Sequence, residues 1–243
     1  MEAFLKADGE CPICEKSVEF VATDANLRDN FVCPICKSIP RERSLFLVLK
    51  TLYPNWKNLH IHESSPIRRG ASERLRRECI NYSFSQYDPS ILPGSVHPDK
   101  GHRSEDLENL TFEGESFDIF VTQDVFEHLY HPDRAAKEIA RVLRPGGAHI
   151  LTTPLTQQNR ASRRRCKLED GARVDLLPPI FHGNPMSKDG SVVTVDWGYD
   201  ILTYLSHHSG AVCSMYIYDD LNRGLRGQLM EVVVNSKVAA VRL

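Results

Sequence analysis

Apolar and polar residues follow two different periodicities in the middle of the chain. Residues 117–129 read as a buried strand with a polar end, and residues 144–154 as a glycine turn followed by a second buried strand. Between them, residues 132–143 gather apolar side chains on one helical face, with a proline in the first turn. This order predicts one βαβ unit of a parallel sheet. Such sheets bind ligands at the carboxyl ends of their strands.

Shorter patterns on both sides extend this unit into a larger α/β fold. They predict strands at 59–63, 80–84, 211–217 and 229–234 and helices at 70–79 and 199–208. Residues 88–103 form a longer loop than the fold requires. Residues 45–53 form a helix that is apolar on nearly every side, so we expect it to be covered all round. The segment before this helix should then dock on the main domain.

Four of the seven cysteines stand in two identical tetrapeptides, Cys11-Pro-Ile-Cys14 and Cys33-Pro-Ile-Cys36. Each C-x2-C turn presents two thiolates, and two such turns close a tetrahedral site for a structural zinc ion. Short strands at 17–21 and 30–32 would complete a zinc ribbon that metal stabilises. A redox dithiol or two disulfides are the alternatives, and a reducing compartment favours zinc.

Composition adds mainly exclusions. A chain of 243 residues with 41% hydrophobic content suffices for one α/β domain and a small module. The formal net charge of −2 gives no general attraction to nucleic acid or anionic membranes. The sequence has no apolar run of 18 residues and no basic-then-apolar leader, so we expect a soluble, cytoplasmic protein.

The central unit resembles a known family. Phe117-Asp118, Glu127-His128, Glu138-Ile-Ala-Arg-Val-Leu143 and Arg144-Pro-Gly-Gly147 look like the middle of a class I S-adenosylmethionine (SAM)-dependent methyltransferase of the type 11 kind. The resemblance implies an α/β, Rossmann-like, seven-stranded, mostly parallel sheet with flanking helices, closed by an antiparallel pair of strands. We expect a zinc ribbon at 1–43, a connecting helix at 44–57, and a methyltransferase domain at 58–243 with an insertion at 155–198.

The resemblance also implies that SAM lies across the carboxyl ends of the first four strands. The first motif of the family usually combines an acid with glycines, and here it reads Glu63-Ser64-Ser65-Pro66 without glycine. A second register places His60 at the acidic position, and both registers stay open. Gln86 and Tyr87 end the second strand, where Gln86 would replace the usual ribose-binding acid and Asp88 follows two residues later.

Two further segments complete the implied cofactor site. Asp106 and Leu107 match the family segment whose acid binds the adenine amino group and whose apolar residue touches the ring. Gln123, Asp124 and Val125, after the fourth strand, should flank the methionine part and the sulfonium.

Methyl transfer is an in-line displacement that requires positioning and, for an alcohol or amine acceptor, removal of a proton. Candidate bases are His128 and His182, with His131 nearby. The pattern Asp124-x-x-Glu127-His128 also resembles a divalent-metal motif of ubiquinone-pathway O-methyltransferases. A catalytic base and a second metal site both remain open here.

The insertion supplies groups suited to a small-molecule pocket, namely His182, Asn184, Asp196, Trp197 and Tyr199. The leading hypothesis is therefore a methyltransferase that acts on a small metabolite. An RNA methyltransferase that uses the ribbon and the basic run 160–167 is the second hypothesis, although the ribbon carries few basic residues. The third is a degenerate, non-catalytic fold that acts as a binding module.

Overall fold

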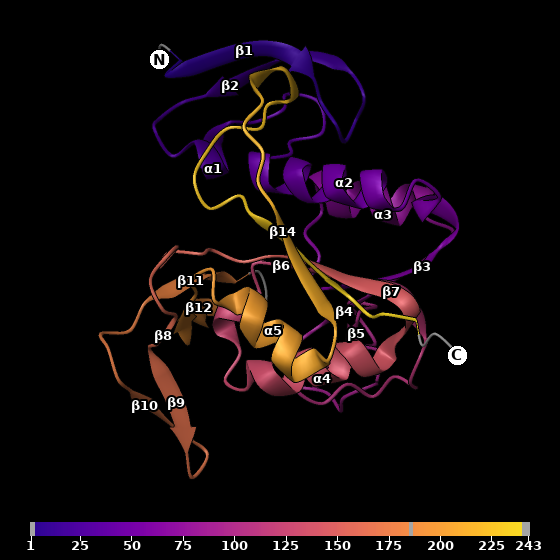
Figure 1. The fold of residues 1–243 in the computed structure, drawn as a ribbon, viewed down its shortest axis with the longest axis vertical. Helices are drawn as coiled ribbons and strands as arrows, with labels where there is room; N and C mark the ends of the chain where they lie inside the picture. Colours follow the sequence, from indigo (N-terminus) through magenta and orange to yellow (C-terminus); the bar gives the residue numbers. More distant parts are fainter. Residues whose placement is uncertain (1–2, 185–186, 240–243) are drawn as a thin grey trace.

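The computed structural model describes residues 3–184 and 187–239. In this part of the chain a seven-stranded sheet forms the centre of the molecule (Figure 1). In spatial order its strands are β14 (Val212–Tyr216), β15 (Val232–Ser236), β7 (Leu143–Thr152), β6 (Phe117–Gln123), β3 (His60–Ser64), β4 (Asn81–Gln86) and β5 (Arg103–Ser104). Strands β7, β6, β3, β4 and β5 run parallel, and β15 is antiparallel to both β7 and β14. The Rossmann-like mixed sheet expected from the sequence is confirmed.

The central βαβ unit consists of β6, helix α4 (Pro132–Val142) and β7. The glycine turn expected at its end lies inside strand β7 as a bulge, because Phe117 pairs with Leu143 while Ile119 pairs with Ala148. A Cβ atom on Gly147 would lie 2.6 Å from the carbonyl oxygen of Asp118, so only glycine fits there. After the bulge, β7 pairs with β6 again, so no separate loop interrupts the strand.

Helices cover both faces of the sheet, which gives three layers. Helices α2 (Pro40–Leu52) and α3 (Gly70–Glu78) pack on one face, and α4 and α5 (Ile201–Ser209) pack on the other, as Figure 1 shows above and below the sheet. Helix α2 is buried along most of its length, as its apolar pattern predicted. Gly210, in the left-handed region at φ 69°, ends α5 where the sequence placed the cap.

The cysteine module, defined as residues 3–39, lies on α2 opposite the sheet. It contains the antiparallel pair β1 (Leu5–Glu10) and β2 (Ser17–Ala22) and the short helix α1 (Leu27–Asn30). The strand expected at 30–32 is wrong: α1 takes its first residue, and the rest contributes one bridge between Val21 and Val32. Buried residues of the module join those of α2 and the sheet in one core, so the module is docked as expected.

Arg43 is one of the buried arginines that tie this module to the rest of the chain. Arg43 on α2 donates hydrogen bonds to the carbonyl oxygens of Ser38, Phe31 and Gly224, and its guanidinium lies 4.6 Å from the ring centre of Phe20. Gly224 follows the 3-10 helix η3 (Leu221–Arg223), in the connection between β14 and β15. The connection between β14 and β15 therefore contacts Arg43 and helps to hold the module on α2.

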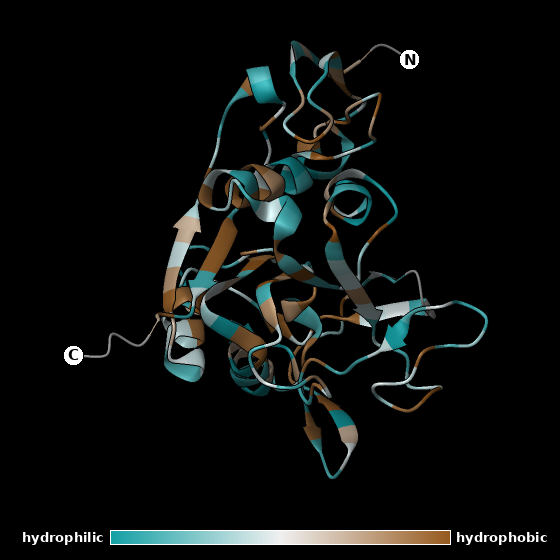
Figure 2. Ribbon diagram, turned by 90° about the vertical axis from the view of Figure 1, so that its right-hand side faces the viewer, coloured by the Kyte–Doolittle hydropathy of each residue, from teal (hydrophilic) through white to brown (hydrophobic). Residues whose placement is uncertain are grey.

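The insertion at 155–198 folds as short antiparallel pairs outside the main sheet. They are β8 (Arg163–Arg164) with β13 (Val195–Asp196), β9 (Cys166–Glu169) with β10 (Ala172–Asp175), and β11 (Phe181–Asn184) with β12 (Ser187–Val192). In Figure 2 the apolar residues concentrate on the strands at the centre, while polar stretches occupy the peripheral loops. None of the helices in residues 3–184 and 187–239 combines the length and apolar character that a membrane crossing requires.

Candidate functional site

The parallel strands β3, β4, β5 and β6 end at one edge of the sheet. The strand pairing places Ser64 beside Ser85 and Thr122, and Gln86 beside Ser104. The segments in which the sequence predicted cofactor contacts therefore begin at the same edge, although they come from four separate parts of the chain. The parallel topology alone produces this convergence.

The structure places Glu63 in a buried network of hydrogen bonds. Its carboxylate is fully buried and accepts hydrogen bonds from Ser72 Oγ at 2.7 Å, Tyr82 Oη at 2.8 Å and Gln123 Nε2 at 2.8 Å. Burial raises the pKa of this carboxyl group. With no accessible surface and three donors, Glu63 joins β3, β4, β6 and α3, and its contact with the cofactor stays a prediction.

The alternative register at His60 does not fit. His60 begins β3, at the opposite end of the strand from the carboxyl edge, and its backbone N–H donates to Asp118 Oδ2 at 2.8 Å. The turn after β3 instead begins at Ser64 and Ser65, and Ser65 adopts φ 59°. A serine therefore occupies a left-handed backbone position that glycine usually takes.

The end of β4 separates Gln86 and Tyr87 from Asp88. Gln86 is partly exposed and Tyr87 is 59% exposed, so both present side chains to solvent at the edge. Asp88 is buried, and its carboxylate is engaged by His102 Nε2 at 2.9 Å and by Ser90. The hydrogen bond from Ser90 lowers the pKa of Asp88 to about 2. Asp88 therefore fixes the loop, and Gln86 remains the polar side chain available there.

Asp106 and Leu107 lie in the turn between β5 and β6. Asp106 Oδ1 accepts a hydrogen bond from the backbone N–H of Glu108 at 2.9 Å, while Leu107 is buried in the core that lies against α4. The nearby charges of Asp106 and Glu108 help to raise the pKa of Tyr87, after the larger effect of burial. Tyr87 and Asp106 thus face the same region of the edge.

Asp124 pairs with two arginines that the sequence interpretation missed. Arg28 of α1 donates to Asp124 Oδ2 at 2.7 Å, and Arg41 Nε lies 3.2 Å from the same oxygen. Burial alone would raise the pKa of Asp124, but the attraction of Arg41 and Arg28 outweighs it and lowers the pKa. The cysteine module therefore reaches the carboxyl edge directly. No local sequence signal marks this contact, because the residues lie 96 positions apart.

This arginine pair leaves hydrogen-bonding capacity unused. Among the described residues, the buried Nη1 atom of Arg41 has no hydrogen-bond partner. Arg28 also pairs with Asp29 at 3.2 Å, so the donor that stays free at this position, within the described chain, belongs to Arg41. Buried donors without acceptors are costly, so this position suits an additional anion.

A cluster of a carboxylate and two histidines lies beyond Asp124. His128 Nε2 and His182 Nδ1 each lie 3.7 Å from Glu127 Oε1. The Glu127 carboxylate raises the pKa of His182. The two histidines expected as separate bases therefore meet at one carboxylate. His131 is not among the three residues of this cluster.

The other polar and aromatic groups of the insertion have mainly structural surroundings. Trp197 is buried in the core, Asp196 accepts from Arg163 and Arg165 at 2.9 and 2.7 Å, and Tyr199 donates to Glu231. The substrate pocket suggested by the sequence for these residues stays a prediction. Asn184 lies on β11 beside His182 and donates to Ser191 Oγ.

Most basic side chains of the run 160–167 make contacts of this kind within the protein. Besides the pairs with Asp196, Arg164 donates to the carbonyl oxygens of Leu129 and Tyr130, and Lys167 pairs with Glu169. These partners engage four of the basic side chains, and Arg163 and Lys167 stay 53% and 47% exposed.

The four cysteine sulfurs meet as predicted. Sγ of Cys11 lies 3.7 Å from that of Cys36, and Sγ of Cys14 lies 3.8 Å from that of Cys33. A disulfide needs about 2.05 Å, whereas a tetrahedral zinc ion with bonds of about 2.3 Å spaces its sulfurs by about 3.8 Å. The cluster thus fits zinc and does not fit disulfides.

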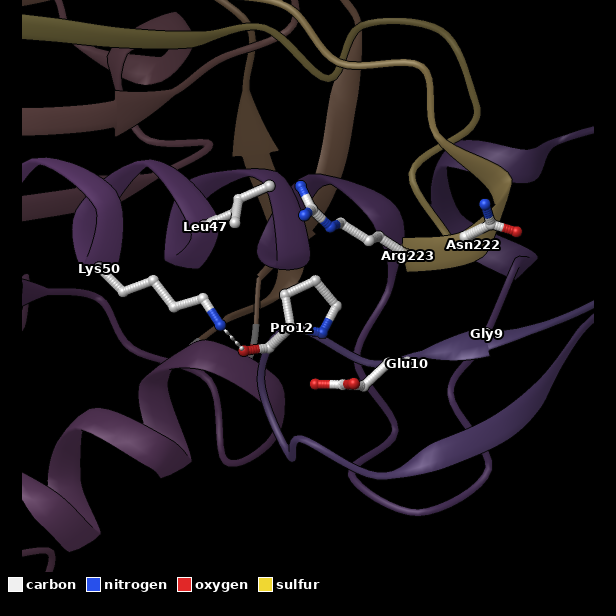
Figure 3. Close-up of a pocket in the computed structure, with 7 residues that line it drawn as sticks. All are labelled: Gly9, Glu10, Pro12, Leu47, Lys50, Asn222 and Arg223. Atoms are coloured by element: carbon white, nitrogen blue, oxygen red, sulfur yellow. Dashed lines mark hydrogen bonds between the residues drawn. The ribbon is translucent and has the colours of Figure 1, made fainter.

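Two cavities lie near these elements. One, of about 480 Å³, borders the carboxyl edge and is lined by residues of the β3–α3 turn, α3, β4 and the following loop, including Pro66, Ser72 and Gln86. The other, of about 440 Å³, lies where the cysteine module meets α2 and η3, with Glu10, Lys50 and Arg223 around it (Figure 3). No residue of the carboxyl edge lines the second cavity.

Comparisons with known proteins agree with this geometry. Residues 79–151 match the family model described as a methyltransferase domain. A stretch of 107 residues, 44% of this chain, is 27% identical to the glycine/sarcosine/dimethylglycine N-methyltransferase of Actinopolyspora halophila. That stretch covers 19% of the relative, so the chain spans about a fifth of its length.

Streptomyces venezuelae DesVI is a solved structure with a similar fold. It superposes with a TM-score of 0.50 at 12% identity, over 82% of this chain and 92% of that one. An S-adenosylmethionine dependent methyltransferase from Mesorhizobium loti gives a TM-score of 0.49 at 15% identity, over 79% and 97% of the two chains.

The fold is therefore the Rossmann-like fold of methyltransferases. The matched family segment runs from the end of α3 to β7, and so contains β4, β5 and β6, three of the strands that form the carboxyl edge. The matched segment is thus similar to a methyltransferase domain, and the relative that is 27% identical over 107 residues is named as an N-methyltransferase.

Proposed function

We propose that the protein transfers a methyl group from SAM to a small-molecule acceptor at the carboxyl edge of β3, β4, β5 and β6. One observation carries this proposal: the segment that matches the methyltransferase domain, residues 79–151, supplies most of the polar residues that converge there. When bound, SAM supplies an electrophilic methyl group on a sulfonium. The relative that acts on glycine, sarcosine and dimethylglycine supports a small acceptor.

Different residues of the carboxyl edge bind different parts of the cofactor. In this proposal Asp106 and Leu107 hold the adenine, Gln86 and Tyr87 hold the ribose, and the main chain at Ser64 and Ser65 approaches the methionine part. Glu63 supports that turn from below through its three hydrogen bonds. A neutral Gln86 can still accept a hydrogen bond from a ribose hydroxyl through its amide oxygen.

The methionine part of SAM carries a carboxylate, and the edge offers a matching cation. Arg41 has a buried, unpartnered Nη1 atom beside Asp124, among the residues described. We assign Arg41 and Arg28 to this end of the cofactor, with Gln123, Asp124 and Val125 around them. Charge-assisted hydrogen bonds of this kind are the stronger ones in proteins.

The four-cysteine cluster takes a structural role in this proposal. Zinc bound by Cys11, Cys14, Cys33 and Cys36 would fix the module that carries Arg28, since a module of this size has little core of its own. The zinc ion and the SAM site are then linked through the contact between Arg28 and Asp124. RNA is not favoured as a substrate, because the basic run is occupied by internal partners.

Calorimetric titration of SAM into the zinc-loaded full chain tests the proposal. We expect binding of one SAM per chain, weakened at least tenfold by Asp106→Ala and by Arg41→Ala. Asp99→Ala, at an exposed position of the loop after β4, is the matched control and should bind as the wild type does. Absence of any binding heat from the wild type would refute the proposal, and would favour a non-catalytic binding module.

A further inference from the structure

Three potential metal ligands from distant segments converge beside the carboxyl edge. Glu127 and His128 belong to the 3-10 helix η2 (Phe126–His128), directly after β6, and His182 belongs to β11 of the insertion. Their ligand atoms all lie within 4.8 Å of one another. The insertion is tied to this point, since Thr194 N–H donates to the Glu127 carbonyl oxygen at 2.7 Å.

Glu127 has a buried oxygen that no hydrogen bond satisfies. Its Oε2 atom accepts from Thr153 Oγ1 at 2.8 Å, but Oε1 has no hydrogen-bond partner among the described residues. The side chain is 2% exposed, so water does not readily solvate it. A buried carboxylate oxygen without a partner is costly, and its distance of 3.7 Å from each histidine nitrogen is too long for a hydrogen bond.

His128 is oriented as metal-binding histidines usually are. Its Nδ1 atom lies 2.8 Å from the carbonyl oxygen of Val192 and must carry the proton to donate there. The lone pair then stands on Nε2, the atom nearer to Glu127 Oε1. A backbone carbonyl that fixes the histidine tautomer in this way is a common outer partner of metal ligands.

We propose that Glu127 Oε1, His128 Nε2 and His182 Nδ1 bind a divalent transition-metal ion. Two imidazoles and one carboxylate suit Zn²⁺, Fe²⁺ or Mn²⁺ and leave coordination positions open for water or an acceptor oxygen. Bonds of about 2.1 Å require ligand atoms about 3.0 to 3.4 Å apart, and His182, which is 41% exposed, can rotate to close the difference.

Asp124 is not part of this ligand set, in contrast to the pattern Asp124-x-x-Glu127-His128. Both of its oxygens are engaged, Oδ2 by Arg28 and Oδ1 by Thr152. His182 takes the third place instead, and no motif in the sequence joins it to Glu127. The metal-binding claim does not depend on methyl transfer. An ion here would acidify an acceptor hydroxyl bound to it.

Metal titration of the full chain tests this site. Protein that already carries one zinc per chain in the cysteine cluster is titrated with Zn²⁺ and, separately, with Mn²⁺. We expect one further ion per chain, with affinity reduced at least tenfold by His182→Ala and by the nearly isosteric Glu127→Gln. His207→Ala, an exposed histidine on α5, should leave the binding unchanged.

Thermal unfolding and total zinc content of each variant report whether it folds and keeps the cysteine-bound ion. His182→Ala removes an exposed side chain and should fold even if Glu127→Gln does not. If neither metal binds a second time, or if folded His182→Ala binds as the wild type does, the site is refuted. In that case the cluster is a carboxylate and histidine group without metal.

Discussion

The guanidinium of Arg28 in the cysteine module donates a 2.7 Å hydrogen bond to Oδ2 of Asp124 at the end of β6. Asp124 adopts φ 52°, and Thr152 on the neighbouring strand donates to its other oxygen at 3.1 Å. The module thus contacts the carboxyl edge of the sheet as well as α2. This contact links a four-cysteine cluster to the proposed cofactor site.

Replacing Arg28 should weaken both stability and cofactor binding. The pair is mostly buried, with 12% and 18% of the two side chains exposed. Loss of one partner of a fully buried pair costs about 3–5 kcal/mol, so we expect Arg28→Gln to lower the free energy of unfolding by about 2 kcal/mol. The affinity for SAM should fall about tenfold. Urea unfolding and calorimetry measure the two effects.

Arg77→Gln is the control for this change. Arg77 of α3 pairs with Glu78, and its side chain is 61% exposed, so its loss should change the free energy of unfolding by less than about 0.5 kcal/mol. Equal losses of stability from the two substitutions would show that the Arg28 contact contributes no more to the free energy of unfolding than an exposed ion pair does.

Zinc removal should impair cofactor binding at a distance. Cys33→Ser is expected to abolish the bound zinc, loosen the cysteine module and weaken SAM binding at least tenfold, because Arg28 loses its position. Zinc content and calorimetric affinity are measured together. Cys79→Ser is the matched control: Cys79 donates to the Leu59 carbonyl oxygen, which a serine can also do. If the zinc-free chain bound SAM normally, the link through Arg28 would be wrong.

Restoring glycine to the first motif should stabilise the chain. Ser65 adopts φ 59°, a region that costs a non-glycine residue about 1 kcal/mol or more. We expect Ser65→Gly to raise the free energy of unfolding by about 0.5 kcal/mol, because the greater entropy of the unfolded chain offsets part of the relieved strain. Ser65→Val should lower the free energy of unfolding. Urea unfolding of both variants tests this, and a stabilising valine would show that the turn is unstrained.

Two buried histidines should make the fold acid-sensitive. Burial lowers the pKa values of His62 and His149 to about 3, whereas in the unfolded chain each titrates near about 6.5. Between these values the unfolded state binds more protons, so stability falls as the pH decreases, by up to about 1.4 kcal/mol per pH unit for each histidine. Urea unfolding between about pH 6 and pH 4 measures the slope.

His149→Leu should remove the contribution of one histidine to the pH dependence of the free energy of unfolding. His149 is fully enclosed between Phe120 and Phe126, so leucine suits the surroundings even though Thr122 loses a hydrogen-bond partner. The lost hydrogen bond lowers stability at all pH values and leaves the slope as the readout. An unchanged slope would show that His149 is not the group that titrates.

The central βαβ unit was predictable because its residues are local and strongly periodic. The strands β6 and β7, the helix α4 and the cysteine pairs all carry short-range signals, as does the left-handed cap at Gly210. The glycine segment at 145–147 was predicted as a turn but forms a bulge inside β7, because a bulge satisfies the same sequence without leaving the strand.

The site was less predictable, because its decisive contacts are long-range. Glu63 accepts hydrogen bonds from Ser72, Tyr82 and Gln123, which come from three other elements of the fold. Arg28 reaches Asp124, and His182 reaches Glu127, only through the docking of the module and of the insertion. Neither contact leaves a periodic or spaced signature in the sequence.

A crystal structure of the zinc-loaded chain with S-adenosylhomocysteine, the demethylated product of SAM, tests the central claim most directly. We predict adenine beside Asp106 and Leu107, the ribose beside Gln86, and the carboxylate of the ligand bonded to Arg41. An edge that stays empty at saturating ligand, or a ligand bound away from β3, β4, β5 and β6, would contradict the assignment of this edge as the cofactor site.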